Sequence, residues 1–316
     1  MLKLFGKRRA QTSRIGVSIG PAGTALAAVD CPSPDARPRL TLCEHLQSDA
    51  AGLARLGQTL RDHGLDRAPM SVVTQAQDYE LVLIETPDVL PEELRAAVRW
   101  RLKDMIGFNI DEAVVDVFGI PDQSHRSSAR AAYAVAARSE ALDRYAATIT
   151  QATRSLDVVD IPELCLRNLC MLTDANRTGV AMLLAGEKSG LLVLVHNSFL
   201  YVARHIEWSR SYEMDGAVAA NPGARPSIDA SALALEVQRS LDYYESHFDH
   251  PPIGELLIAP LQAELASLAT ELRSVIGLRV TLFDANILLD CTAPLTAETQ
   301  AQCVLAIGAA LRREAA

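Results

Sequence analysis

Two stretches of the chain share one layout, and this repetition restricts the fold more than any other feature. In residues 15–46 an apolar run reaches Gly20, turns through Pro21-Ala22-Gly23, and continues in a second and a third run. Residues 179–206 repeat the order of strand, glycine-containing turn, strand, turn and strand. Apolar runs separated by Gly and Pro are typical of β-hairpins, so each stretch predicts a three-stranded meander. A duplicated unit of this length predicts two related lobes.

Helical patterns and further strands follow each meander, which predicts an α/β protein with mixed sheets. Residues 70–138 have their own order of strand, helix, strand and strand, and they predict a small subdomain inserted in the first lobe. The helix in this segment carries an apolar stripe at helical spacing, made of Leu94, Val98, Leu102 and Met105. The expected division is a basic N-terminal lead at 1–14, a first lobe at 15–69 and 139–177, the inserted subdomain at 70–138, and a second lobe at 178–316.

Composition and charge exclude several classes of function. The chain has 316 residues and a net charge of −9, which argues against binding to nucleic acid. No apolar run approaches the roughly 20 residues that span a bilayer, and the N-terminus lacks a secretory signal, so we expect a cytoplasmic protein. Its basic lead, MLKLFGKRR, is a solvated tail or a weak contact with anionic lipid. The six cysteines are scattered without a CxxC pair, so we expect reduced thiols and no metal site.

Four stretches carry a family resemblance through their order, spacing and residue types. They are LVLIETPDVLPEELRAAVRWRLKDMIGFNIDEAVVDV at 81–117, YAVAARSEALDRYAATITQA at 133–152, LDVVDIPELCLRNL at 156–169 and LALEVQRSLDYYESHF at 233–248. The chain resembles the PilM family of type IV pilus assembly proteins, in the actin-like ATPase superfamily, and its pattern is nearest to the MshI proteins of MSHA-type pili. This resemblance implies a two-lobed actin-like (ribonuclease H-like) α/β fold with a small α+β subdomain inserted in the first lobe.

The first phosphate-binding turn of that superfamily has the pattern Asp-x-Gly. Backbone N–H groups of such turns point at nucleotide phosphates, and nearby carboxylates hold Mg²⁺ through water. In this chain the Asp position is Ser18, Gly20 is retained, and Pro21 follows. Serine supplies no negative charge for a hydrated metal ion, and proline removes one N–H group. The first turn therefore departs from the pattern that the chemistry needs.

The other two nucleotide-binding turns also depart from the family pattern. The second Asp-x-Gly turn is Leu184-Ala185-Gly186 here, followed by Glu187 and Lys188. In the family a Ser-Gly-Gly turn lets the base lie against bare backbone, whereas this chain has Ala259-Pro260-Leu261. The three departures together predict a pseudo-ATPase with no catalytic residue and no cofactor.

An alternative keeps a nucleotide site with atypical loops. In it Glu187 or Asp30 replaces the missing carboxylates, Lys188 contacts phosphate, and ATP with Mg²⁺ is the ligand. The chain is then an active ATP-binding switch or an ATPase. The residues of the degenerate cleft under either hypothesis are Ser18, Gly20, Gly186, Glu187 and Lys188.

The resemblance also implies a function. The protein is expected to be a scaffold or adaptor in the assembly platform of a type IV (MSHA-type) pilus or a related secretion system. A groove beside the inserted subdomain would bind the cytoplasmic tail of a single-span, PilN-like inner-membrane protein by main-chain pairing and apolar pockets. The expected groove residues are Tyr79, Leu81, Leu83, Leu94, Val98 and Phe108. Membrane attachment would come from the partner, assisted by the basic lead. A third hypothesis for the function is a filament-forming protein of the actin type.

Overall fold

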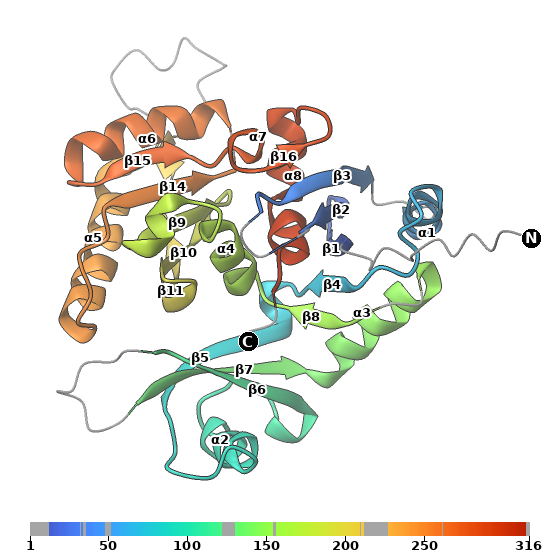
Figure 1. The fold of residues 1–316 in the computed structure, drawn as a ribbon. Coiled ribbons are helices and arrows are strands. Elements are labelled where there is room, and N and C mark those ends of the chain that lie inside the picture. The colour runs from blue at the N-terminus through green and yellow to red at the C-terminus, as the bar shows by residue number, and fades with distance from the viewer. Residues whose placement is uncertain are drawn as a thin grey trace, which may run out of the picture.

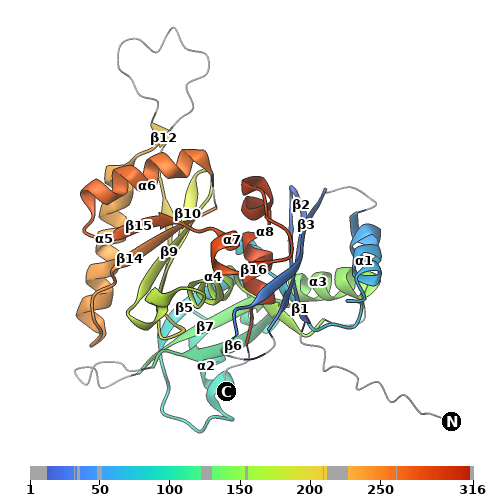
Figure 2. The same cartoon turned by 45° about the horizontal axis from the view of Figure 1, so that its top comes forward.

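A computed structural model describes residues 13–31, 33, 36–47, 52–121, 130–153, 156–208, 210–211, 227–260 and 262–313. The expected basic lead lies outside these residues except for its last two positions, and Leu261 lies outside them as well. Figure 1 shows two lobes side by side, with a small three-stranded subdomain beneath them. The view in Figure 2, turned by 45°, shows the same separation of the two large sheets.

The first lobe is built on a six-stranded sheet with the order β16-β3-β2-β1-β4-β8. Its strands are β1 (Ser13–Gly20), β2 (Gly23–Asp30), β3 (Arg39–Gln47), β4 (Met70–Val73), β8 (Val158–Asp160) and β16 (Asp290–Cys291). β1, β2 and β3 are antiparallel, whereas β4 runs parallel to β1 and β8 runs parallel to β4. One face packs on α1 (Gly52–Asp62) and α3 (Ser139–Ala152), and the other packs on α8 (Ala297–Ala310).

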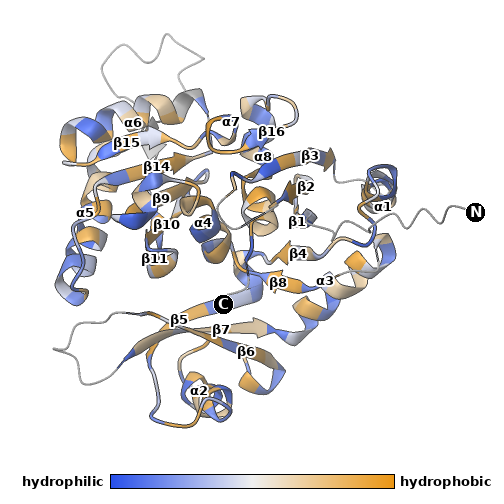
Figure 3. Ribbon diagram, viewed as in Figure 1, coloured by the Kyte–Doolittle hydropathy of each residue, from blue (hydrophilic) through white to orange (hydrophobic). Residues whose placement is uncertain are grey.

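The second lobe has a five-stranded sheet with the order β11-β10-β9-β14-β15. Its strands are β9 (Val180–Ala185), β10 (Ser189–His196), β11 (Phe199–Glu207), β14 (Glu255–Ala259) and β15 (Arg279–Leu282). The helices around it are α4 (Pro162–Cys170), α5 (Ala230–His247), α6 (Ala263–Val275) and the short α7 (Ala285–Leu288). A separate two-stranded antiparallel sheet consists of β12 (Arg210–Ser211) and β13 (Ser227–Ile228). Hydrophobic residues run along the strands of both large sheets, as Figure 3 shows.

The inserted subdomain is an antiparallel sheet with the order β5-β7-β6 and one covering helix. Its elements are β5 (Tyr79–Glu85), α2 (Leu94–Leu102), β6 (Ala113–Gly119) and β7 (Ala131–Arg138). Three short 3-10 turns complete the described elements, η1 (Ala76–Asp78), η2 (Ile110–Glu112) and η3 (Asp174–Arg177). One face of this sheet packs on α2 in a separate small core.

The duplicated meander is confirmed, because β1–β3 and β9–β11 have the same antiparallel connectivity. Two expected boundaries are wrong. Met70 begins β4, which pairs with β1 in the first-lobe sheet, so the inserted subdomain starts only after β4. The final helix α8 packs against that same sheet, although the sequence assigned it to the second lobe. Met105 is 50% exposed instead of buried, because α2 ends at Leu102.

Helix α8 lies unusually close to its neighbours, because one glycine of β1 faces it and another glycine lies within it. A Cβ atom placed on Gly16 of β1 would lie 1.9 Å from the carbonyl oxygen of Ala306. A Cβ atom on Gly308 of α8 would lie 2.4 Å from the carbonyl oxygen of Cys165 in α4. Only glycine allows backbones to approach to this extent. The contact places α8 between the first-lobe sheet and α4, at the junction of the two lobes.

Candidate functional site

The β1–β2 turn is the first position where a phosphate would bind. Gly23 has a φ of +147°, and a Cβ atom on it would lie 2.2 Å from the carbonyl oxygen of Leu46. A Cβ atom on Gly20 would meet nothing within 4 Å. Gly23 is therefore needed for contact with β3, whereas the space around Gly20 is open. The conformation of this turn is explained by packing, without a bound phosphate.

The strand register brings a carboxylate to the same edge of the sheet as Ser18. Ser18 of β1 pairs with Val73 of β4, and Val73 pairs with Asp160 of β8. Two strand spacings separate Ser18 from Asp160, which is about 10 Å. The sequence analysis missed Asp160. Its signal was the buried run VVD directly before a helix that begins with Pro162.

The carboxylate of Asp160 is already occupied by groups of this chain. Arg312, just after α8, places Nη1 2.7 Å from Oδ2 of Asp160, with 26% of the Arg312 side chain and none of the Asp160 side chain exposed. The backbone N–H of Ile161 donates to Oδ1 of Asp160 at 2.9 Å. A buried charge in a protein needs such a partner. Arg312 supplies the positive charge that a hydrated metal ion would otherwise bring to this carboxylate.

The second turn lies between β9 and β10, and Gly186, Glu187 and Lys188 are exposed there. The N–H of Gly186 donates to the carbonyl of Ser189 at 2.8 Å, which closes the turn on itself. Leu184 pairs with Ala259 of β14, so the two altered motifs of the second lobe are neighbours in one sheet. Ser18 and Leu184, the two positions that the sequence analysis compared with the carboxylates of the family, both have uncharged side chains.

Asp30 does not belong to this cleft. It pairs with Ser13 and with Arg39, at the opposite end of β2 from Gly23. Seven residues of extended strand separate it from the turn, which is roughly 23 Å. The hydroxyl of Ser13 donates to its carboxylate. Of the two carboxylates considered as replacements, only Glu187 lies near a predicted phosphate turn.

A buried glutamate joins three parts of the molecule. Glu163, in the first turn of α4, accepts a hydrogen bond of 2.6 Å from the hydroxyl of Tyr79 in β5. Its second oxygen lies 3.8 Å from Nε2 of His205 in β11. Burial, with the charge and hydrogen bond of Glu163, raises the pKa of Tyr79. The subdomain and the second lobe are thus held to the same side chain.

The contact between His205 and Glu163 predicts a pH dependence. The interaction with Glu163 raises the pKa of His205 above its usual 6.5, and burial opposes this. A raised pKa in the folded state adds stability that is fully present below pH 6.5 and is lost as pH rises through the folded pKa. We expect a loss of about 0.5 kcal/mol, because the half-exposed imidazole is screened by solvent.

The measurement is urea unfolding of the wild type and of His205→Gln between pH 5.5 and pH 8.5, a range of about one to two units on each side of the ordinary histidine pKa. The difference between the two proteins should shrink as pH rises. A difference that is constant across this range would contradict the assignment.

Tyr133 makes a second connection between the subdomain and the second lobe. Its hydroxyl accepts a hydrogen bond from the N–H of Ala203 at 3.1 Å and donates to the carbonyl of Tyr201 at 3.2 Å. Both backbone groups belong to β11, an edge strand of the five-stranded sheet. The hydroxyl therefore pairs edge groups that a neighbouring strand would otherwise bind.

Replacing Tyr133 by phenylalanine should lower the free energy of unfolding by about 1–2 kcal/mol. The change removes only the hydroxyl and leaves the partly buried N–H of Ala203 and the carbonyl of the buried Tyr201 without that partner. Tyr243→Phe is the matched control, because the Tyr243 side chain is only partly buried and should change stability by less than about 0.5 kcal/mol. Equal effects of the two substitutions in chemical denaturation would show that the Tyr133 hydroxyl contributes nothing specific.

The six residues expected to form a partner groove do not share one surface. Tyr79, Leu81 and Leu83 alternate along β5 and face the rest of the molecule, where Tyr79 is buried and Leu81 packs against the main core. Val98 is fully buried on the opposite face of the sheet. Leu94 and Phe108 pack against that same small core, which α2 closes. The sequence places these segments near one another along the chain, but it does not show which face of the β5 sheet each segment covers.

Only Leu83 of these six has a substantially exposed side chain, at 39%. Its strand, β5, pairs with β7 alone among the described residues, so the other edge of β5 has no strand partner there. The guanidinium of Arg138 lies over the ring of Phe108, and its central carbon is 4.1 Å from the centre of that ring. The accessible part of the predicted groove is therefore the end of β5 around Leu83.

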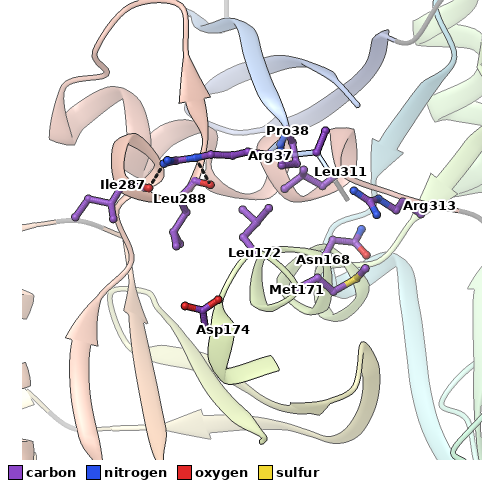
Figure 4. Close-up of a pocket in the computed structure, with 11 residues that line it drawn as sticks. Arg37, Pro38, Asn168, Met171, Leu172, Asp174, Ile287, Leu288, Leu311 and Arg313 are labelled. Atoms are coloured by element: carbon purple, nitrogen blue, oxygen red, sulfur yellow. Dashed lines mark hydrogen bonds between the residues drawn. The ribbon is translucent and has the colours of Figure 1, made fainter. Parts of the chain in front are cut away.

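A cavity of about 480 Å³ lies at the opposite end of the first-lobe sheet from the β1–β2 turn. Figure 4 shows that the link before β3, the end of α4, α7 and the residues after α8 surround it. Arg37 donates to the carbonyl of Leu288 at 3.3 Å and to that of Leu289 at 3.1 Å, and a third bond goes to Ile287. This arginine, which the sequence analysis did not single out, ties the first lobe to the end of α7.

Two features are absent from the part of the chain that the structure describes. None of the described helices is both long enough and apolar enough to cross a membrane. No three of the described His, Cys, Asp or Glu side chains come together in a way that could hold a metal ion.

Comparison with known proteins identifies the fold. No protein-family model and no curated protein matches the sequence. Among solved structures, a chain described as "PilM-PilN type IV pilus biogenesis complex" is 20% identical, with a TM-score of 0.66, and the match covers 94% of this chain and 97% of that one. The cytoplasmic domain of EpsL, an inner-membrane component of the type II secretion system of Vibrio cholerae, is 10% identical over 95% and 96% of the two chains, with a TM-score of 0.49. The protein has the two-lobed actin-like fold.

Proposed function

We propose that this protein is a cytoplasmic scaffold in the assembly platform of a type IV pilus, of the MSHA type, or of a related secretion system. The observation that carries the proposal is the end-to-end similarity of the fold to the chain from the PilM–PilN complex. In this proposal the partner is a PilN-like inner-membrane protein with one membrane span. Its cytoplasmic tail brings the scaffold to the membrane.

The altered cleft supports a scaffold instead of an ATPase. Ser18 and Leu184 stand where the phosphate turns of the superfamily have carboxylates. The remaining carboxylate near Ser18, Asp160, is paired with Arg312. A magnesium ion at Asp160 would have to displace that guanidinium and leave the largely buried Arg312 without its carboxylate partner, which is costly.

The free edge of β5 supports a site for an extended peptide. An added strand gains main-chain hydrogen bonds from an unpaired edge and specificity from alternate side chains. β5 has such an edge among the described residues, and Leu83 is accessible on it. The side chains of Leu81 and Phe118 are only partly buried where they pack against the core. We assign the tail of the partner to this end of the subdomain.

Fluorescence polarisation with a labelled peptide tests the proposal. The peptide carries the cytoplasmic tail of the PilN-like protein encoded in the same genome. Leu83→Glu should weaken binding at least about tenfold, because a charge would be buried against the peptide. Val275→Glu is the matched control, since Val275 is an exposed apolar residue of α6 in the other lobe. No binding by the wild type, or equal affinity of the two variants, would contradict the assignment.

A second candidate function is an ATP-dependent switch, favoured by the retained Gly20 and by the exposed Glu187 and Lys188 in the second turn. Isothermal titration of the protein with ATP and Mg²⁺ separates the two functions. The scaffold proposal expects no saturable heat. Saturable binding at micromolar ATP, lost in Lys188→Ala, would favour the switch.

A further inference from the structure

Three of the six cysteines lie where β3, β16 and α8 meet. Cys43 belongs to β3, Cys303 to α8, and Cys291 to β16, which pairs with β3. Cys303 is completely buried, whereas Cys43 and Cys291 are partly exposed. The sequence analysis expected all six thiols to be reduced. The fold brings residues from the two ends of the chain into one thiol cluster.

The backbones in this cluster are close enough for side chains as short as cysteine to meet. Gly16, on the sheet face beneath α8, lets the helix approach the strands, and Ala25 and Ala27 add only methyl groups to the same packing. The thiol of Cys303 donates to the carbonyl of Glu44 at 3.4 Å, and Glu44 directly follows Cys43 in β3. The thiols of Cys43 and Cys303 lie near enough for a hydrogen bond between them to shift both pKa values.

The hydrogen bond makes the two thiols chemically different. It lowers the pKa of Cys303, with help from the N–H of Leu26, although burial acts in the opposite direction. The same hydrogen bond, with burial, raises the pKa of Cys43. The thiolate is the reactive form of cysteine, so the lower pKa makes Cys303 the better nucleophile of the pair once peroxide reaches its buried sulfur.

The third thiol is held apart from this pair. Cys291 donates to the carbonyl of Ala285 at 3.7 Å, within its own segment. Burial and the neighbouring Asp284 and Asp290 carboxylates raise its pKa, which makes it a weaker nucleophile. Cys291 is therefore a control position in the same cluster.

We propose that Cys43 and Cys303 are a redox-sensitive pair that peroxide converts into a disulfide joining β3 to α8. The Cys303 thiolate attacks one oxygen of hydrogen peroxide, the O–O bond breaks, and hydroxide leaves, which gives a sulfenic acid on Cys303. The Cys43 thiol then loses its proton and attacks the Cys303 sulfur, and the sulfenic oxygen leaves as water. Two thiols give up two electrons to one peroxide, and the products are one disulfide and two waters.

The bond would act at the junction of the lobes. α8 follows the segment of α7 and β16, and it packs on both the first-lobe sheet and α4. A covalent link from α8 to β3 would therefore fix this helix on the sheet and restrict movement of one lobe against the other. The reduced form lacks this restraint.

The test treats the full chain with excess hydrogen peroxide, blocks remaining thiols with N-ethylmaleimide, and maps peptides without reduction by mass spectrometry. We expect a peptide pair linked through Cys43 and Cys303. We also expect an increase in Tm of about 5 °C or more that dithiothreitol reverses, because the bond closes a very long loop. Cys43→Ala should abolish both signals, and Cys291→Ala should retain them.

Circular dichroism confirms that each variant is folded before oxidation, and Cys303→Ala serves as a second pair-breaking variant. A folded wild type that forms no linked peptide would overturn the proposal. A disulfide that involves Cys291, or a Tm increase that persists in Cys43→Ala, would overturn it as well.

Discussion

Gly16→Ala should lower the free energy of unfolding by about 3 kcal/mol or more, the upper range for overpacking. The added methyl group would lie 1.9 Å from the carbonyl oxygen of Ala306 and 2.5 Å from the backbone N of Ala310. Both atoms belong to the backbone of α8, so no side chain can rotate away. The helix must move off the sheet, and the lobe junction loses its packing.

Gly20→Ala is the matched control for this prediction. Gly20 is in the same strand, and a Cβ atom there meets nothing within 4 Å. Urea unfolding monitored by circular dichroism should show a change of less than about 0.5 kcal/mol, as for a surface substitution. Similar losses in both variants would show that the cost comes from β1 itself and not from its contact with α8.

Arg312→Met should lower the free energy of unfolding by about 3 kcal/mol, because it leaves the Asp160 carboxylate buried without its charge partner. The side chain of Asp160 is fully buried, and Arg312 is only partly exposed. Arg239→Met removes an arginine from an exposed ion pair with Glu236 on α5, and it should cost less than about 1 kcal/mol.

The double substitution Asp160→Asn with Arg312→Met separates the charge from the packing. It should recover more than half of the loss in Arg312→Met, because no buried charge remains. A double variant that is as unstable as the single variant would show that the aliphatic part of Arg312, and not its charge, holds the junction. Guanidinium is unsuitable as the denaturant here, since its ionic strength screens ion pairs.

Local patterns predicted most strands and helices, because their signals are contained in short segments. The run YELVLIE is typical of a strand, and β5 covers the same residues, Tyr79–Glu85. A glycine after a helical pattern is typical of a helix end, and Gly64, just after α1, has a φ of +67°. The two meanders were predicted from turns that each lie within a few residues. The short α7 and β16 were missed, since four and two residues carry too weak a periodic signal.

The candidate site was less predictable, because its contacts join residues far apart in the chain. Asp160 became relevant only when the register placed it in one row with Ser18. Its partner Arg312 lies at the other end of the chain and has no motif around it. The opposite faces of Leu83 and Val98 likewise depend on which side of β5 the helix α2 covers.

The pairing of β16 with β3 also determines when the first lobe can finish folding. Asp290 and Cys291 complete the edge of a sheet whose other strands come from the first half of the chain, and α8 covers one face of that sheet. During synthesis the open edge and the uncovered face of this sheet remain exposed until α8 has left the ribosome. Contacts of such long sequence separation slow folding and expose aggregation-prone surfaces. We therefore expect the nascent first lobe to aggregate more readily than the finished protein.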